Sequence, residues 1–110
     1  MSLNMKSTLE VEANGFARFV ALMSGMVPIL EGVGWKLDGA YLHTSGRLNT
    51  VVDVWTLEDY NHYGRGLQVL MSHPEFPRFA QTLGEVVRNE TVVFLQALQY
   101  PRPSLAKAAP

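Results

Sequence analysis

The side chain in this sequence with the strongest chemical potential is a carboxylate in the middle of an apolar strand. Asp53 stands between Val52 and Val54, and a carboxylate is costly to bury there unless it is paired. If its side of the sheet is enclosed, desolvation raises the pKa of Asp53 and makes it a proton acceptor. The alternative is a structural carboxylate that hydrogen-bonds Tyr41 or pairs with an arginine. Asp53 is therefore the first candidate catalytic residue.

Histidine is the next candidate for acid–base chemistry. His43 lies near the end of a predicted strand, where it is either a general base, a metal ligand or a polar residue that closes a hairpin. We expect His62 on the outer or edge face of a helix and His73 at a helix end. No two of these histidines stand four residues apart and the chain has no cysteine, so no dedicated zinc site is expected.

Polar and aromatic residues of the same region could position a small ligand. Asn49 could donate a hydrogen bond to a carbonyl or enolate oxygen, or it could order the hairpin. Trp55 is expected in the core or in a subunit interface. Tyr41, Tyr60 and Arg65 are further candidates for ligand contact. No Ser-His-Asp order and no phosphate-binding glycine loop is evident, and no cofactor is expected.

Length and composition limit the class of protein. A chain of 110 residues predicts one domain. Charged residues make up 17%, below the usual ~25%, which suggests that another subunit covers some apolar surface. The net charge of -1 argues against nucleic-acid binding. No continuous apolar run approaches about 18 residues and the first ten residues hold no signal core, so a soluble cytoplasmic protein without membrane contact is expected.

Apolar periodicity predicts an order of strand, helix, strand, strand, helix, strand. Asn14 is expected to cap the first helix and Pro28 to bend or break its end. Thr56 with Asp59 resembles a capping box for the second helix. The nearly continuous apolar residues of the fourth strand predict that it is buried on both faces. The predicted segments are a strand at 7–12, a helix from 16 to about 30, strands at 35–44 and 48–55, a helix to about 72, a short helical piece at 76–83, a link at 84–89 and a strand at 91–98.

The register of the central hairpin decides which side chains share a face with Asp53. An even-length loop would place Asp38 opposite Asp53, so we favour an odd loop with Gly46 as a left-handed bulge residue. This register puts Ala40 and Leu42 with the aliphatic side of the third strand. It gathers the remaining candidates on one face: Trp35, Tyr41, His43, Asn49, Asp53 and Trp55.

This element order indicates an α+β, ferredoxin-like βαββαβ domain with a four-stranded antiparallel sheet and both helices on one face. The domain is expected to span residues 7–100, with a disordered N-terminus at 1–6 and a flexible tail at 101–110. The other sheet face would then expose apolar side chains, so a homodimer through that face is expected. The residues expected there are Trp35, Tyr41, Val51, Trp55 and half of the last strand.

The central segment resembles the NIPSNAP family. Residues 46–55 follow the pattern G-x-L-N-x-V-V-x-x-W and run into a helix that opens with Leu57-Glu58-Asp59-Tyr60. The segment 25–29, Arg65 and the Pro74-x-Phe76 step add weaker similarity, and the resemblance covers most of residues 8–100. The family commonly has histidine where Asp53 stands, and its second helix is usually richer in arginine.

The resemblance implies a dimeric α/β barrel, a superfamily that includes cofactor-free monooxygenases, haem-degrading enzymes, isomerases and proteins without assigned chemistry. Two hypotheses follow. One is an enzyme acting on a small apolar or aromatic carbonyl compound, with Asp53 or His43 as its base. The other, which we favour, is a NIPSNAP-like dimer of unassigned activity that binds a small apolar or aromatic ligand. Haem degradation would require a histidine facing a wide cleft.

Overall fold

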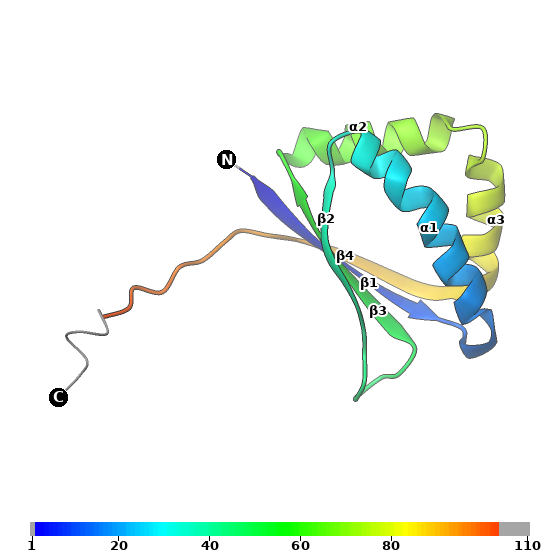
Figure 1. Cartoon of the computed structure of the whole chain (residues 1–110), viewed down its shortest axis with the longest axis horizontal. Helices are drawn as coiled ribbons and strands as arrows, with labels where there is room; N and C mark the ends of the chain where they lie inside the picture. The colour runs from blue at the N-terminus through cyan, green and yellow to red at the C-terminus, as the bar shows by residue number, and fades with distance from the viewer. Residues whose placement is uncertain (1, 104–110) are drawn as a thin grey trace.

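A four-stranded sheet and three helices make up the protein (Figure 1). The computed structural model describes residues 2–103, so most of the predicted tail, 104–110, lies outside the described residues. The elements are β1 (Leu3–Val11), a 3-10 turn η1 (Ala13–Gly15), α1 (Phe16–Gly32), β2 (Lys36–Leu42), β3 (Thr50–Leu57), α2 (Tyr60–Ser72), α3 (Phe76–Val86) and β4 (Val87–Leu95).

The sheet has the strand order β2-β3-β1-β4 and all its neighbours run antiparallel. The helices lie together on one side of it, as Figure 1 shows, and this confirms the α+β, ferredoxin-like prediction. The second helical region is split in two. His73 has an extended conformation before Pro74, which ends α2, and a new helix begins at Phe76.

Helix α1 supplies most of the apolar surface that covers the sheet. Its buried residues recur every three to four positions, as in an amphipathic helix: Phe19, Leu22, Met26 and Leu30. Pro28 is accommodated inside the helix, which continues to Gly32. Asn14 does not cap it, because the chain first makes a 3-10 turn and Gly15 takes the N-cap position without a side-chain cap.

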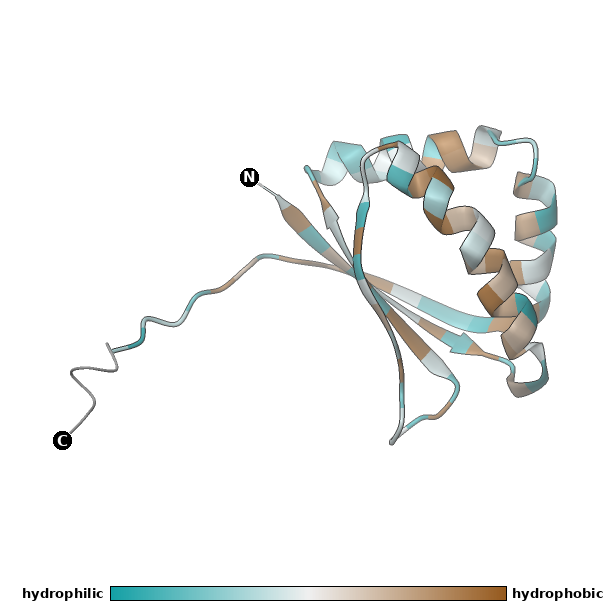
Figure 2. Cartoon of the chain, in the orientation of Figure 1, coloured by the Kyte–Doolittle hydropathy of each residue, from teal (hydrophilic) through white to brown (hydrophobic). Residues whose placement is uncertain are grey.

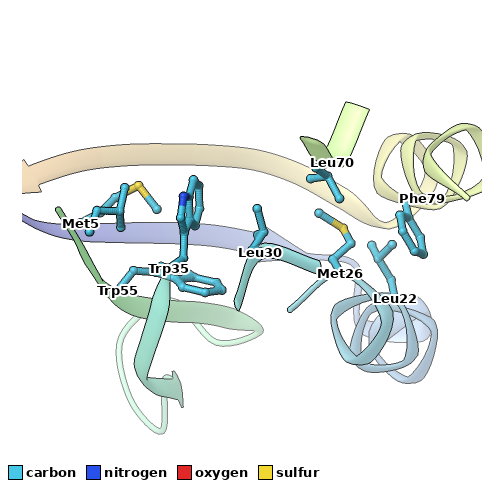
Figure 3. Packing of buried hydrophobic residues seen from close by; sticks show 9 residues of the cluster. Met5, Leu22, Met26, Leu30, Trp35, Trp55, Leu70 and Phe79 are labelled. Carbon is cyan, nitrogen blue, oxygen red and sulfur yellow. The ribbon is translucent and has the colours of Figure 1, made fainter. Parts of the chain in front are cut away.

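The core lies between the helices and the sheet (Figure 3). Met5 and Trp55 come from the sheet, and residues of all three helices close over them. Trp35, just before β2, packs edge to face against Trp55 with ring centroids 5.4 Å apart. Burying each such side chain contributes roughly 1.5–3 kcal/mol, so this layer dominates the stability of the domain.

Both ends of the sheet region differ from the prediction. Strand β1 begins at Leu3, and Met5 is a core residue, so the disorder expected at 1–6 is wrong for residues 3–6. Strand β4 begins at Val87, directly after α3, where a link was expected, and it ends at Leu95. The prediction that it is buried on both faces is also wrong, because Val93 and Leu95 are exposed on the uncovered face.

The predicted hairpin register is wrong. The His43 N–H donates to the Thr50 carbonyl at 2.9 Å, which leaves an even-length loop over 44–49. Ala40 then pairs with Asp53. The repulsion that argued for an odd loop does not arise, because the six-residue loop places Ala40, and not Asp38, opposite Asp53. A β-bulge between Leu37 and Gly39 sets Asp38 beside Thr56, whose hydroxyl donates to its carboxylate.

The helices cover the other face of the central strand from the one expected. Val51 and Trp55 are buried under the helices, as is Trp35, and none of them lies on the open face as predicted. Tyr41 does lie there, because it pairs with Val52. The open face carries partly or fully exposed apolar side chains: Tyr41, Val52, Val54, Val93 and Leu95.

One segment is long and apolar enough to cross a membrane by length and composition, which the sequence reading did not anticipate. It is Ala13–Gly32, with a mean hydropathy of 1.3, and Figure 2 shows how much of α1 is apolar. Core helices of soluble domains pass the same test, and α1 places its apolar stripe in the core. The segment is therefore weak evidence for membrane contact.

Candidate functional site

A cavity of about 540 Å³ opens between α1 and β2, and we call it the Asp53 cleft. Its volume lies in the range of small-molecule sites, roughly 300–1,000 Å³. Among the described residues that line it, Asp53 is the only carboxylate. The walls are otherwise mostly apolar: Phe16, Phe19, Val20, Met23, Ser24, Val27 and Pro28 from α1, and Leu37, Ala40, Tyr41, Leu42 and Val51 from the sheet.

Asp53 is buried, but its carboxylate remains free to interact with a molecule in the cleft. It is 4% exposed, and no hydrogen bond or ion pair among residues 2–103 engages its carboxylate. Burial raises the pKa of Asp53 from 3.8 to about 6, and the nearby negative charge of Glu90 adds to the effect. A carboxylate with a pKa close to neutrality is a better proton acceptor than an ordinary aspartate.

Asp53 also borders a smaller cavity of about 250 Å³ beneath the helices, which we call the inner cavity. Ser7 and Glu90 line it as well. Ser7 is the cross-strand partner of Asp53, and its hydroxyl donates to Glu90 Oε2 at 3.2 Å. The sequence reading missed both residues. Strand alternation could have found them, because Ser7 lies on the same sheet face as Met5, and Glu90 lies on the same face as Val92.

His43 and Asn49 lie away from the cleft, near the hairpin loop. His43 hydrogen-bonds through Nδ1 to the carbonyl oxygen of Arg47 at 2.9 Å. Asn49 has a left-handed backbone, φ 60°, and its carbonyl accepts from the Val11 N–H at 2.9 Å. The structure therefore does not bring either residue together with Asp53. The expected convergence fails for His43 because the hairpin register differs, and for Asn49 because its left-handed backbone lies in the loop before β3.

The other predicted ligand contacts are dispersed. Tyr41 borders the cleft, but its ring lies over Gly39 on the open face, where its hydroxyl would meet an added Cβ at 2.5 Å. Tyr60 is 66% exposed at the start of α2. Arg65 forms an exposed ion pair with Glu58 at 3.2 Å. Trp55 shares the inner cavity with Asp53, as part of its wall.

His62 is a core residue and not the surface residue that helix periodicity predicted. It is 1% exposed. Its Nδ1 accepts from the Glu58 N–H at 2.9 Å, and its Nε2 donates to the Val33 carbonyl at 2.8 Å. The His62 N–H in turn donates to Asp59, which caps α2 alone, without the predicted help of Thr56. Both ring nitrogens are used, and they tie α2 to the segment before it and to the loop between α1 and β2.

Within residues 2–103, no three His, Cys, Asp or Glu side chains converge as metal ligands would. The polar groups that do converge are Asp53, Ser7 and Glu90, whose chemistry is proton transfer and hydrogen bonding. The arrangement can therefore hold a small apolar molecule against one basic carboxylate.

No family model matches this sequence, and no curated protein matches it either. Solved structures do match its fold. A NIPSNAP-like domain protein from Burkholderia xenovorans is 20% identical with a TM-score of 0.76, over 93% of this chain and 90% of that one. A NIPSNAP family protein from Agrobacterium tumefaciens is 12% identical with a TM-score of 0.79, over 91% of this chain and 96% of that one.

A third similar structure is SnoaB from Streptomyces nogalater, a cofactor-independent oxygenase. It is 14% identical with a TM-score of 0.65, over 90% of this chain and 95% of that one. At these identities the likeness is one of fold. The resemblance indicated by the central motif is confirmed at that level, because NIPSNAP proteins and SnoaB are among the structures that share the fold of this chain.

Proposed function

We propose that the Asp53 cleft binds a small apolar or aromatic molecule that carries a carbonyl or hydroxyl group. The observation that supports this is a cleft of about 540 Å³ whose mostly apolar walls surround one buried carboxylate. Apolar walls supply affinity through burial, while a single polar group orients the ligand.

Binding of 2-naphthol, followed by calorimetry, tests this proposal. Val27→Arg places a charged side chain in the cleft and is expected to weaken binding at least about ten-fold. The matched control is Val69→Arg on the exposed side of α2, which should leave affinity unchanged. Equal binding by the wild type and Val27→Arg would show that the ligand sits elsewhere.

A second candidate function is proton abstraction by Asp53, favoured by its lack of a partner and its pKa of about 6. The carboxylate would take a proton next to a carbonyl group and leave an enolate in the cleft. An isomerase would return that proton to another carbon. An oxygenase without a cofactor would let the enolate reduce dioxygen. This reaction is a candidate because SnoaB, whose fold is similar, is a cofactor-independent oxygenase.

Hydrogen–deuterium exchange of 1-indanone tests this second function without knowledge of the natural substrate. The protein is expected to accelerate exchange of the acidic α-protons, and Asp53→Asn should lower that acceleration at least about a hundred-fold. If Asp53→Asn exchanges the protons as fast as the wild type, the base is not Asp53.

The proposed working form is a cytoplasmic homodimer joined through the open face of the sheet. Its exposed apolar residues support this, because single-domain monomers rarely leave such a patch uncovered. Light scattering should give twice the chain mass of 12.3 kDa. Val93→Asp is expected to shift the protein toward the monomer and Val69→Asp to leave it dimeric. A wild-type monomer would contradict the proposal.

A further inference from the structure

Three polar side chains cross the sheet in a line beneath the helices. Asp53 lies on β3, Ser7 on β1 and Glu90 on β4, which are neighbouring strands in that order. Ser7 pairs with Asp53 across β1 and β3, so their side chains share a face about 5 Å apart at Cβ. On its other side, the Ser7 hydroxyl bonds Glu90 at 3.2 Å. A hydroxyl thus stands between two carboxylates.

The line also runs from the interior to solvent. Asp53 and Ser7 are 4% and 6% exposed, whereas Glu90 is an exposed residue. Glu90 stands on β4, at one edge of the sheet, and the Asp53 cleft opens beside β2, at the opposite edge. Ser7 and Glu90 line only the inner cavity, so a ligand in the cleft would contact Asp53 and leave them free.

We propose that Ser7 and Glu90 form a proton path from Asp53 to solvent at the β4 edge, which works while a ligand fills the cleft. The proposal rests on the second candidate function, in which Asp53 takes a proton. Asp53 makes no hydrogen bond to Ser7 in this structure, so the protonated carboxyl first turns toward its cross-strand partner. It then gives its proton to Ser7 Oγ as the Ser7 hydroxyl gives its own to the Glu90 carboxylate. Asp53 is again a carboxylate, Ser7 is unchanged, and Glu90 passes the proton to water.

The other groups around this line do not offer a competing route. The surfaces of α1 and α3 that face the inner cavity are apolar: Met23, Met26 and Leu30, and Phe76 and Leu83. Helix α2 adds one titratable group, Tyr63. Burial, with the charge of Glu90, raises the pKa of Tyr63 above its ordinary value of 10.0, so the phenol keeps its proton. Ser7 is then the one hydroxyl bonded to Glu90 among the described residues.

The experiment measures how fast Asp53 gains a proton when its cleft is closed. The infrared carbonyl band of protonated Asp53, assigned by its loss in Asp53→Asn, is followed after a pH jump across the pKa of about 6. Naphthalene closes the cleft in one arm. In the other arm Ala40→Trp closes it without any ligand, since Ala40 is exposed and pairs with Asp53.

In both arms, Ser7→Ala and Glu90→Gln are expected to slow protonation about ten-fold. Ser7→Thr keeps a hydroxyl and should restore the rate, which a merely structural role of Ser7 would not explain. Thr8→Ala, on the opposite sheet face, and Glu12→Gln are the matched controls and should change nothing. Wild-type rates in Ser7→Ala and Glu90→Gln would overturn the path.

Failure of this inference is separable from failure of the proposed function. If 2-naphthol does not bind and exchange of 1-indanone is not accelerated, the proposed function fails, while the Ala40→Trp arm still decides whether Ser7 and Glu90 carry the proton. If 2-naphthol binds and 1-indanone exchanges but the two variants protonate Asp53 normally, the function stands and the path does not.

Discussion

Two places inside this domain hold a buried polar side chain, and they differ in how its hydrogen bonds are used. At the junction of β2 and α2, both ring nitrogens of His62 are bonded to backbone groups. In the cleft, Asp53 is nearly as buried but has no partner among the described residues. A satisfied buried group fixes the structure, whereas an unsatisfied one that faces a cavity is available to a ligand.

The two places also differ in free space. We call the first the β2–α2 joint, made of Val33, Gly34, Trp35, His62 and Gly66. In the joint, a Cβ added at Gly66 would overlap the Trp35 indole, whose Nε1 donates to the His62 carbonyl at 3.0 Å. The cleft, in contrast, keeps about 540 Å³ unfilled. Close packing thus marks the structural site and empty volume the candidate functional one.

The largest expected effect breaks the joint at its centre. His62→Ala leaves the Glu58 N–H and the Val33 carbonyl buried without partners and opens a cavity, so we expect a loss of about 4 kcal/mol in the free energy of unfolding. Urea denaturation measures it. His43→Ala, at a partly exposed histidine whose side chain makes one hydrogen bond, is the control and should cost less than about 1 kcal/mol. Equal losses would remove the distinction between the two regions.

A pair of glycines in one helix tests the packing of the joint. Gly66→Ala is expected to destabilise by about 2–3 kcal/mol because its methyl group displaces Trp35. Gly64→Ala, two residues earlier, meets nothing within 4 Å and should stabilise by about 0.5–1 kcal/mol through helix propensity. Thermal or urea unfolding compares them. If Gly66→Ala stabilised the protein, the joint would have room for a methyl group beside Trp35.

The carboxylate of the cleft should appear in the pH dependence of stability. Because the folded protein holds the Asp53 proton up to a pKa of about 6 and the unfolded chain releases it near 3.8, this proton stabilises the fold fully only below the lower value. Its contribution, roughly 1–3 kcal/mol, is lost as the pH rises through about 6.

Asp53→Asn should remove that decline and leave the other titrations in place. Comparing unfolding free energies of the two proteins between the two pKa values isolates the difference in slope. Parallel curves would show that solvent in the cleft keeps the pKa of Asp53 close to its ordinary value.

The smallest expected effect lies outside both regions. Arg65→Ala breaks an exposed ion pair with Glu58 and should change stability by less than about 0.5 kcal/mol. It should also leave 2-naphthol affinity unchanged, because Arg65 does not line the cleft. A large loss of affinity would extend the ligand site onto α2.

The order of elements and the α1 stripe could be predicted, because both depend on local periodicity along the chain. Asp53 stood out for the same reason, as one carboxylate among valines. His62 was misplaced because its partners, Val33 and Glu58, come from segments outside its helix. Periodicity locates a face of a helix, but it does not show what a neighbouring loop brings to that face.

Two further errors have a common cause, the position of strand ends. The predicted fourth strand began at residue 91, so it left out Glu90, which alternation along β4 (Val87–Leu95) places on the same sheet face as Ser7. The pairing of the hairpin strands ends at His43 and Thr50, and the even-length loop between them turns His43 to the face opposite Asp53. A shift of one residue reverses the faces of a strand, so small local features decide the composition of the site.

The bulge in β2 bears on how this chain can change in length. Leu37 pairs with Trp55 and Gly39 with Val54, so Asp38 is one residue more than the ladder needs. A chain without Asp38 would keep each remaining residue of β2 opposite its present partner. A single deletion elsewhere in the strand would instead turn half of its side chains to the wrong face. Evolution can therefore shorten this strand at one position while retaining the cleft.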